Sequence, residues 1–505
     1  MLPRCTIALI VGFFLLKDIQ AQDSLLHQRI TIPETICSID EALKIVEKTT
    51  GLSFSYNSGL IDKRKIITLK ADQEELISVL YRIFGDASLQ FSVLGRHLAV
   101  YRPYRVPSAD PSRINDSVNL YVISGQVMAR DTRQPLPFSS VYLDGKPTGT
   151  ISNEEGEFRL KLDAAKMHDT LIISCMGYKN FISPVSALIN SNRSYFLVPD
   201  IIPIQEVIIR KVSPVILLQE AVREIRNNYP ADPALLTSFY RETVQRGNRF
   251  TMVSEAILEN YKTGYQSNAA DRVKIIKGRK NENLTREDSV ILKLKAGLNT
   301  MLMLDVVKNI PDFLTGESLA DYRYRLTDIV VEDGRDNYAV EFTPLETSPE
   351  HSFYSGRIII DINDMAFKWV EFQVDPANLE LATERFIVRK PANVKVKTLK
   401  ASYKVGYRKF GDKYYLHTIA CETGFRVRNR RQFSGSVYNT KLETVVTAID
   451  TVNVNRFSLR ESARQFDIFT EQLGTGDESY WGEYNYIAPE ESLENALKKL
   501  VRDSQ

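Results

Sequence analysis

The sequence has few cysteines and few histidines, and this scarcity excludes several kinds of chemistry. Its 505 residues include four cysteines and five histidines. Loss of Cys5 with the leader described below would leave three scattered cysteines, and an odd, scattered set does not fit a disulfide framework. No histidine has a glutamate three residues later, so the HxxE and HExxH spacings that place two zinc ligands on one face are absent. We therefore expect neither a metal nor another cofactor.

The chain also lacks a strong net charge and the motifs of common enzymes. A formal net charge of +2 gives no overall field that would recruit nucleic acid. Two basic runs, 272–286 and 426–431, have acidic neighbours and no interleaved aromatic residues, which favours solvated loops over a nucleic-acid site. A serine nucleophile elbow, a phosphate loop and a dinucleotide glycine fingerprint are missing. We identify no catalytic residue and predict that the protein is not an enzyme.

Apolar runs long enough to span a membrane are missing as well. Residues 1–21 combine Arg4, an apolar run from Ile7 to Leu16 and a small residue, Ala21, which is typical of a cleavable secretory signal. The run is too short to cross a bilayer with ease, so an uncleaved anchor is the weaker alternative. We expect an exported protein that is periplasmic or associated with the outer membrane.

Residues 28–102 contain an internal repeat. A shift of 37 residues superposes two β-α-β patterns, each with apolar residues at i, i+3, i+4 and i+7 of a helix. These positions are Ile39, Ala42, Leu43 and Val46 in the first helix, and Leu76, Val79, Leu80 and Ile83 in the second. Ser38 with Glu41 predicts a capping box, and Gly51 predicts the end of the first helix.

This pattern, with the segments "SIDEALKIVEKTTGLSFSY" and "EELISVLYRIFGDASLQFSV", resembles the secretin and TonB short N-terminal domain. The resemblance implies a periplasmic module that makes protein contacts, in receptors often with an anti-sigma regulator. Residues 103–119 follow, with three prolines among Ser, Asp and Asn, and predict a linker.

Residues 120–200 predict a small β-sandwich. Phe158, Leu160 and Leu162 alternate with Arg159 and Lys161, as expected of a half-buried strand, and Gly156 supplies the freedom that a tight hairpin needs. The segments "ISGQVMARDTRQPLPFSSVYLDGKPTGTISNEEGEFRL" and "LIISCMGY" resemble the carboxypeptidase-like regulatory domain, a transthyretin-like sandwich widespread in envelope proteins of Bacteroidetes. That domain accompanies peptidases without holding their zinc.

Residues 205–505 predict a large, strongly curved antiparallel sheet with helices near 215–228 and 490–501. Long alternating strands are separated by expected turns at Gly356 and Gly411. The segment Ile204–Ile209 resembles the motif with which receptors engage TonB, but we interpret it as a linking strand because six apolar residues are a weak signal.

The segments "GRIIIDINDMAFKWVEFQVD" and "YRKFGDKYYLH" resemble the half-barrel of periplasmic lipoprotein carriers, whose concave face holds acyl chains. The resemblance implies a ligand cavity lined by Ile358, Ile360, Phe367 and Trp369; a filled hydrophobic core is the alternative. An aromatic group precedes the last helix and either staples that helix to the sheet or contacts a partner or glycan. Its members are Trp481, Tyr484 and Tyr486.

The sequence thus predicts a multidomain α+β protein with a small doubled β-α-β domain, a transthyretin-like β-sandwich and a large curved sheet with flanking helices. We predict a non-enzymatic cell-envelope protein that binds a hydrophobic ligand or an outer-membrane or periplasmic protein. One alternative is a signalling component that contacts an anti-sigma regulator or the TonB system. Others are an outer-membrane β-barrel, disfavoured by lysine-rich strands such as 393–405, and a hydrolase built from His351, His417, Glu371 and Glu422.

Overall fold

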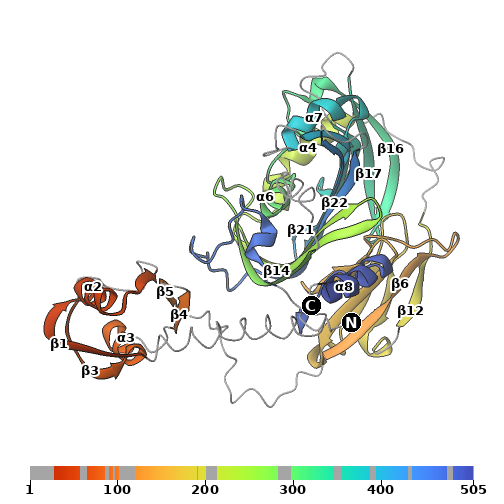
Figure 1. The fold of residues 1–505 in the computed structure, drawn as a ribbon. Helices are drawn as coiled ribbons and strands as arrows, with labels where there is room; N and C mark the ends of the chain where they lie inside the picture. The colour runs from red at the N-terminus through yellow and green to blue at the C-terminus, as the bar shows by residue number, and fades with distance from the viewer. Residues whose placement is uncertain are drawn as a thin grey trace, which may run out of the picture. The chain divides into compact units, whose positions relative to one another are not determined.

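The computed structural model describes residues 28–56, 65–85, 90–94, 97–101, 120–189, 192–200, 213–282, 297–345, 354–386, 394–429, 435–474 and 481–503. They belong to two compact units, within residues 1–117 and 118–505 (Figure 1). The predicted signal sequence, the linker at 103–119 and the segment Ile204–Ile209 lie outside the described residues. In the described part of the chain, no helix is long and apolar enough to cross a membrane.

The first unit is a doubled β-α-β arrangement. Its elements are β1 (Arg29–Ser38), α2 (Ile39–Thr50), β2 (Ser53–Tyr56), β3 (Ile66–Glu75), α3 (Leu76–Phe84), β4 (Gln90–Leu94) and β5 (His97–Tyr101). Strand β1 pairs antiparallel with β3, and β5 lies between β2 and β4. All eight predicted helix positions are buried, Ser38 and Glu41 form the capping box, and Gly51 ends α2 with φ 72°. The local predictions for this unit are therefore confirmed.

The second unit begins with the predicted β-sandwich. Its strands are β6 (Leu120–Ala129), β7 (Ser140–Leu143), β8 (Gly149–Ile151), β9 (Glu157–Asp163), β10 (Thr170–Ser174), β11 (Phe181–Pro184) and β12 (Asn192–Leu197). They form two sheets, ordered β12-β6-β9 and β11-β10-β7-β8. Phe158, Leu160 and Leu162 are buried between these sheets, while Arg159 is exposed. Gly156 has φ 76°, and a Cβ there would lie 2.5 Å from the Val127 carbonyl oxygen, so the hairpin requires glycine.

The rest of the second unit is a ten-stranded antiparallel sheet, which Figure 1 shows to be strongly curved. Its strands, in spatial order, are β15 (Arg272–Glu282), β14 (Arg249–Lys262), β13 (Ala234–Arg246), β22 (Ser436–Asp450), β21 (Lys413–Asn429), β20 (Val394–Phe410), β19 (Phe367–Val374), β18 (Tyr354–Asp361), β17 (Arg335–Pro344) and β16 (Tyr322–Glu332). The helices are α4 (Pro214–Arg223), α5 (Ile225–Asn228), α6 (Leu298–Met303), α7 (Leu379–Phe386) and α8 (Glu491–Asp503). The predicted large curved sheet is confirmed.

The concave face of this sheet is filled by other parts of the chain. Helices α4 and α6 contribute buried side chains such as Leu218 and Met301 to the main hydrophobic core, and Phe313 of a short 3-10 helix stacks on Phe342 with ring centroids 4.4 Å apart. Three of the residues expected to line a ligand cavity, Ile358, Ile360 and Phe367, are at most 1% exposed in the same core. They are packing residues, because helices occupy the space that a ligand would need.

Trp369 does not face this core, and the reason is a β-bulge. Ile359 pairs with Trp369, whereas Ile360 pairs with Phe367, so Lys368 is an extra residue in β19. An extra residue reverses the alternation of side chains beyond it. Trp369 therefore lies on the convex face, where its ring contacts Phe138 of the sandwich at a centroid distance of 6.3 Å. The expectation that it lines a concave cavity is wrong.

The sandwich is fixed to the turn between β16 and β17. The Gly177 amide donates to the Val331 carbonyl at 2.8 Å. The Asp333 carboxylate accepts hydrogen bonds from the Tyr142 hydroxyl at 3.0 Å and from the Asn180 amide at 3.2 Å. These contacts explain why the sandwich and the large sheet form one compact unit.

Gly356 lies inside β18 and is not the turn that its sequence context predicted. It pairs with Phe372 of β19. A Cβ at this position would lie 2.1 Å from the Glu371 carbonyl oxygen. The glycine therefore permits close approach of two strands, a second common use of glycine in sheets.

We expect Gly356→Ala to lower the free energy of unfolding by about 1–3 kcal/mol, because the added methyl group forces the strands apart. Urea denaturation of the full chain measures this change. The matched control is Gly316→Ala, whose Cβ meets no atom within 4 Å and which should change stability by less than about 0.5 kcal/mol. Equal unfolding midpoints for the two variants would contradict the close-approach explanation.

Candidate functional site

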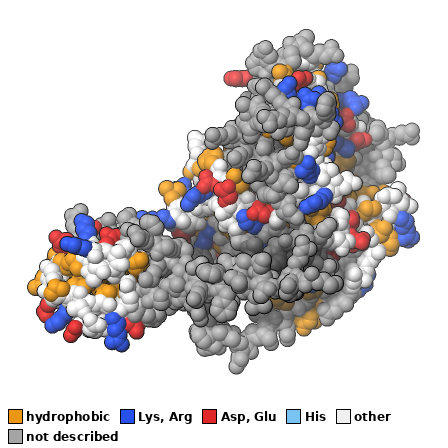
Figure 2. Space-filling model, in the orientation of Figure 1, with side chains coloured by type: hydrophobic (Ala, Val, Ile, Leu, Met, Phe, Trp, Pro, Cys, Tyr) orange, Lys and Arg blue, Asp and Glu red, His pale blue; other side chains and the backbone are white. Residues whose placement is uncertain are grey.

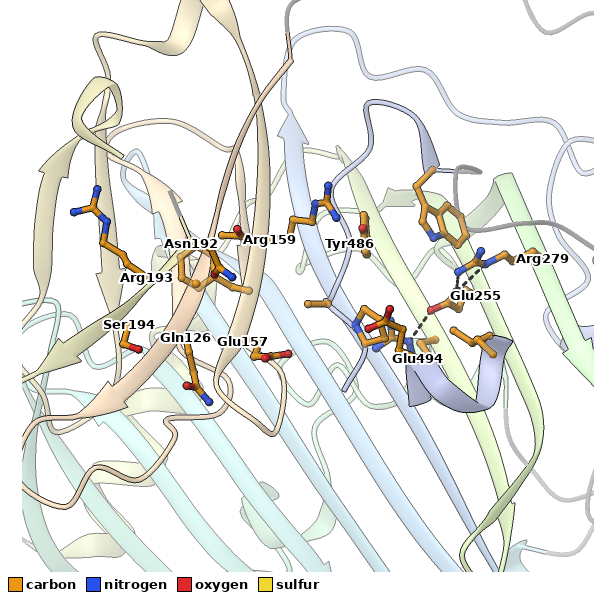
Figure 3. A pocket seen from close by; sticks show the side chains of 18 residues that line it. Gln126, Glu157, Arg159, Asn192, Arg193, Ser194, Glu255, Arg279, Tyr486 and Glu494 are labelled. Atoms are coloured by element: carbon orange, nitrogen blue, oxygen red, sulfur yellow. Dashed lines mark hydrogen bonds and ion pairs between the residues drawn. The ribbon is translucent and has the colours of Figure 1, made fainter. Parts of the chain in front are cut away.

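A cleft of about 890 Å³ lies where the sandwich, the convex face of the large sheet and the segment before α8 meet (Figure 3). One wall is the outer face of sheet β12-β6-β9. The opposite wall consists of residues 481–490, which we call the strap, and the start of α8. Buried side chains of β13, β14 and β15 form the floor. All three walls belong to the second unit.

The sandwich wall carries two rows of polar side chains that run across the three strands. The first row is Asn192, Ser124 and Arg159, and the second is Ser194, Gln126 and Glu157. Four of these six side chains are uncharged groups that donate or accept hydrogen bonds. Arg159 and Glu157 lie at the β9 end of each row and are both exposed. The wall is thus polar, with one charge of each sign.

The floor is a buried cluster of charges. Glu255 accepts hydrogen bonds from Arg241 Nε at 2.8 Å and from Arg279 Nη2 at 2.6 Å. Arg241 and Glu255 are each 1% exposed and Arg279 is 6% exposed. Burial alone would raise the pKa of Glu255, but the two guanidinium groups outweigh it and lower that pKa. The carboxylate therefore stays ionised and holds the two arginines in place.

The aromatic residues of the strap pack inward. The rings of Trp481 and Tyr486 contact Phe239 of β13 at centroid distances of 5.6 and 6.0 Å, and Arg279 lies over the Trp481 ring at 5.1 Å. Trp481 is only 2% exposed, which supports the stapling alternative for this residue over a direct partner contact. An apolar patch on the convex face covers it. Tyr484 and Tyr486 are half-buried and belong to the same cluster.

The strap is held chiefly through its backbone. Four side chains donate to strap carbonyl oxygens: Thr150 to Tyr486 at 3.3 Å, Asn153 to Ala488 at 3.3 Å, Arg241 to Ile487 at 2.7 Å, and Lys161 to Gly482. The side chain of Asn485 also accepts from the Lys161 amide at 2.7 Å and donates to the Lys161 carbonyl at 3.2 Å. The sandwich and sheet thus hold the strap largely through its backbone carbonyl oxygens.

The cleft has an acidic end and a basic end. Burial and the neighbouring Glu155 raise the pKa of Glu157, and the charges of Glu494 and Glu491 act in the same direction. At the other end, burial and then the charges of Arg159 and Lys277 lower the pKa of Lys161. In each case burial is the largest cause, and like charges nearby add to it. Figure 3 shows Arg159 on the side of the cleft near Tyr486 and Glu157 on the side nearer Glu494.

Three of the residues considered for a hydrolase are described, and these three are not assembled into a catalytic group. Burial, together with Arg408 and Lys368, lowers the pKa of His417 well below its ordinary value. Glu371 pairs with Lys404 at 3.7 Å and Glu422 pairs with Lys400, while His351 lies outside the described residues. Within the described residues, no group of three or more His, Cys, Asp and Glu is placed to hold a metal ion. The described cysteines Cys37, Cys175 and Cys421 are free thiols.

The sequence did not predict the cleft, but it did predict the outward face of one strand in its wall. The alternation on β9 correctly placed Arg159 on the outer face. Asn192, Ser194 and the strap come from distant parts of the chain, so their meeting depends on tertiary structure.

Comparison with known proteins finds a family match for one region of the chain. Residues 123–209 match the family model of the CarboxypepD_reg-like domain. A search of curated proteins found no match to the chain. Among solved structures, a LolA superfamily protein from Nitrosomonas europaea is 11% identical, with 47% of this chain and 97% of that one aligned and a TM-score of 0.20.

A second solved structure is the ferripyoverdine receptor of the outer membrane of Pseudomonas aeruginosa bound to ferripyoverdine. It is 8% identical, with a TM-score of 0.14, and the alignment covers 88% of this chain and 60% of the receptor. TM-scores this low support no conclusion about fold or function. The family match is different, because it coincides with the sandwich described above. The sandwich that forms one wall of the cleft is therefore similar to CarboxypepD_reg-like domains.

Proposed function

We propose that this protein is a non-enzymatic component of the cell envelope that acts by binding another envelope protein in the cleft between the sandwich and the large sheet. The cleft itself carries the proposal: it is about 890 Å³ in volume, and groups for polar recognition line its walls. The leader-like residues 1–21 support an exported location. The doubled β-α-β unit supports a further protein contact outside the cleft.

The chemistry of the lining favours a protein over a hydrophobic ligand. An apolar molecule would leave the hydroxyl groups of Ser124 and Ser194 and the side-chain carbonyl oxygen of Gln126 without partners, at a cost in free energy. A protein segment supplies both donors and acceptors to such a surface, as in ordinary protein interfaces. The concave face, where an acyl chain was expected, is occupied by core residues such as Phe313 and Met301.

We expect Ser194→Trp to reduce the recovery of a specific partner by about tenfold, which corresponds to about 1.4 kcal/mol of binding free energy. Ser194 is exposed on β12 and lines the cleft, so a bulky side chain there fills the space that the partner needs. The experiment is affinity purification of the tagged full chain from membranes and periplasm, with partner recovery measured by quantitative mass spectrometry.

Lys146→Trp is the matched control, since Lys146 is exposed at a sandwich turn and does not line the cleft. Both variants should unfold at the wild-type temperature. Full recovery of the partner by the Ser194 variant would reject the cleft as the binding site. Copurification of stoichiometric lipid without a protein would instead support the hydrophobic-ligand alternative.

A further inference from the structure

We propose that the cleft recognises an extended polypeptide segment of the partner in which one basic and one acidic side chain are two residues apart. This inference rests on the proposed function and specifies the chemistry of the partner. The segment would lie along the outer face of the sandwich, beside the strap, with its basic side chain toward Glu157 and its acidic side chain toward Arg159.

The spacing follows from the position of the two charges on one strand. Glu157 and Arg159 are two residues apart on β9, so their side chains point to the same side. Two residues of an extended chain cover about 7 Å. A ligand that is also extended therefore presents matching charges when they are separated by one intervening residue. Both side chains are exposed and so accessible to a partner.

Neighbouring charged residues make one end of the cleft more acidic and the other end more basic. Glu155, Glu491 and Glu494 act on Glu157, which makes its end of the cleft acidic beyond the single carboxylate. The charges of Arg159 and Lys277 both act on Lys161, which makes the other end basic. A ligand with two like charges would meet repulsion at one end, whereas a ligand with one charge of each sign would meet attraction at both.

The strap shows that this region already binds a chain segment through its backbone carbonyl oxygens. Thr150 and Asn153 of the sandwich donate to strap carbonyl oxygens. The cleft continues this interface and offers side chains of the same kind, namely Ser124, Gln126, Asn192 and Ser194. These groups can donate to carbonyls and accept from amides of a second extended segment. Backbone recognition with charge selection at two positions is a common mode of peptide binding.

The test uses four fluorescein-labelled synthetic peptides of about nine residues, built on the same Ser, Gly and Thr sequence and measured with the full chain by fluorescence anisotropy at low ionic strength. Two positions, separated by one residue, carry Lys and Asp, two Lys, two Asp, or two Ser. Surface ion pairs are individually weak, so we expect the Lys and Asp peptide to bind about fivefold more tightly than the two-Ser peptide.

Single charge reversals should redirect this preference whichever way the peptide runs. Arg159→Glu makes both ends acidic, so the two-Lys peptide should bind best. Glu157→Arg makes both ends basic, so the two-Asp peptide should bind best. Lys146→Glu changes the net charge by the same amount as Arg159→Glu, at an exposed sandwich turn outside the cleft, and should leave the wild-type order unchanged.

Equal affinity for all four peptides, no binding of any of them, or an unchanged order in both reversal variants would overturn this inference. None of these results would affect the proposed function, which depends on recovery of a partner and its loss in Ser194→Trp. A partner recovered in that experiment, with no response to the peptides, would point to recognition of a folded surface.

Discussion

Glu255→Gln should lower the free energy of unfolding by about 3–5 kcal/mol, the usual cost of removing one partner from a buried ion cluster. The substitution leaves Arg241 and Arg279 buried without the carboxylate that both now contact. Urea denaturation of the full chain, followed by tryptophan fluorescence, measures the loss. The chain has two tryptophans, and one of them, Trp481, lies against Arg279.

The control for this prediction is Glu371→Gln. Glu371 pairs with Lys404 at 3.7 Å, with side chains 51% and 34% exposed, so its loss should cost less than about 1 kcal/mol. The effect of Glu255→Gln should also depend on pH. Because the folded pKa of Glu255 is lowered, its contribution is present above the ordinary value of 4.5 and declines as pH falls further. Equal costs for the two variants would show that the floor cluster is not a buried ion network.

Glu242→Gln, unlike Glu255→Gln, should raise the free energy of unfolding, by about 3 kcal/mol at pH 8. Burial raises the pKa of Glu242 from 4.5 to about 7, only partly opposed by the hydrogen bond from the Tyr240 hydroxyl. The folded state therefore keeps the proton over a pH range in which the unfolded state loses it. Stability is then highest below pH 4.5 and falls until about pH 7, by about 1.4 kcal/mol for each unit of the shift.

Urea denaturation of the wild type and the Glu242→Gln variant at pH 4 and pH 8 tests whether the substitution stabilises the protein. The stabilisation by glutamine should be close to zero at the lower pH, because the carboxyl is neutral there in both states. Glu317→Gln, at an exposed position, should show little difference between the two conditions. A Glu242 variant that is less stable than the wild type at pH 8 would mean that an ionised carboxylate is held by favourable contacts at this site.

The parts of the fold that local patterns determine were predictable from the sequence. The helix stripes of the first unit and the hairpin at Gly156 depend on residues a few positions apart. Trp369 and Gly356 show where such reasoning fails. One bulge at Lys368 reverses which face Trp369 occupies, and a glycine in a long alternating segment can mark a close strand contact as well as a turn. Filling of the concave face depends on α4 and α6, which come from outside the strands that form it.

The buried charges in the floor of the cleft can be predicted in part from the sequence, but their pairing cannot be predicted without the strand register. Arg241 and Glu255 occupy the same face as the buried Phe239 and Ile257, which is unusual for charged residues and predicts a buried pair. Counting back from the turn at Gly247 would place Arg241 opposite Ser254. A bulge between Val244 and Gln245 moves it opposite Glu255. The pairing of Arg241 with Glu255 can therefore be predicted only when the register is known.

The strap also constrains the order in which the protein can assemble. Its hydrogen bonds to the sandwich join residues 321 to 336 positions apart in the chain. They therefore close some of the longest loops in the second unit and carry a correspondingly large entropic cost. During synthesis the sandwich and most of the large sheet are complete before residues 481–490 exist. We therefore expect closure of the groove between them by the strap to be a late step of folding, in competition with any other chain segment that fits the same groove.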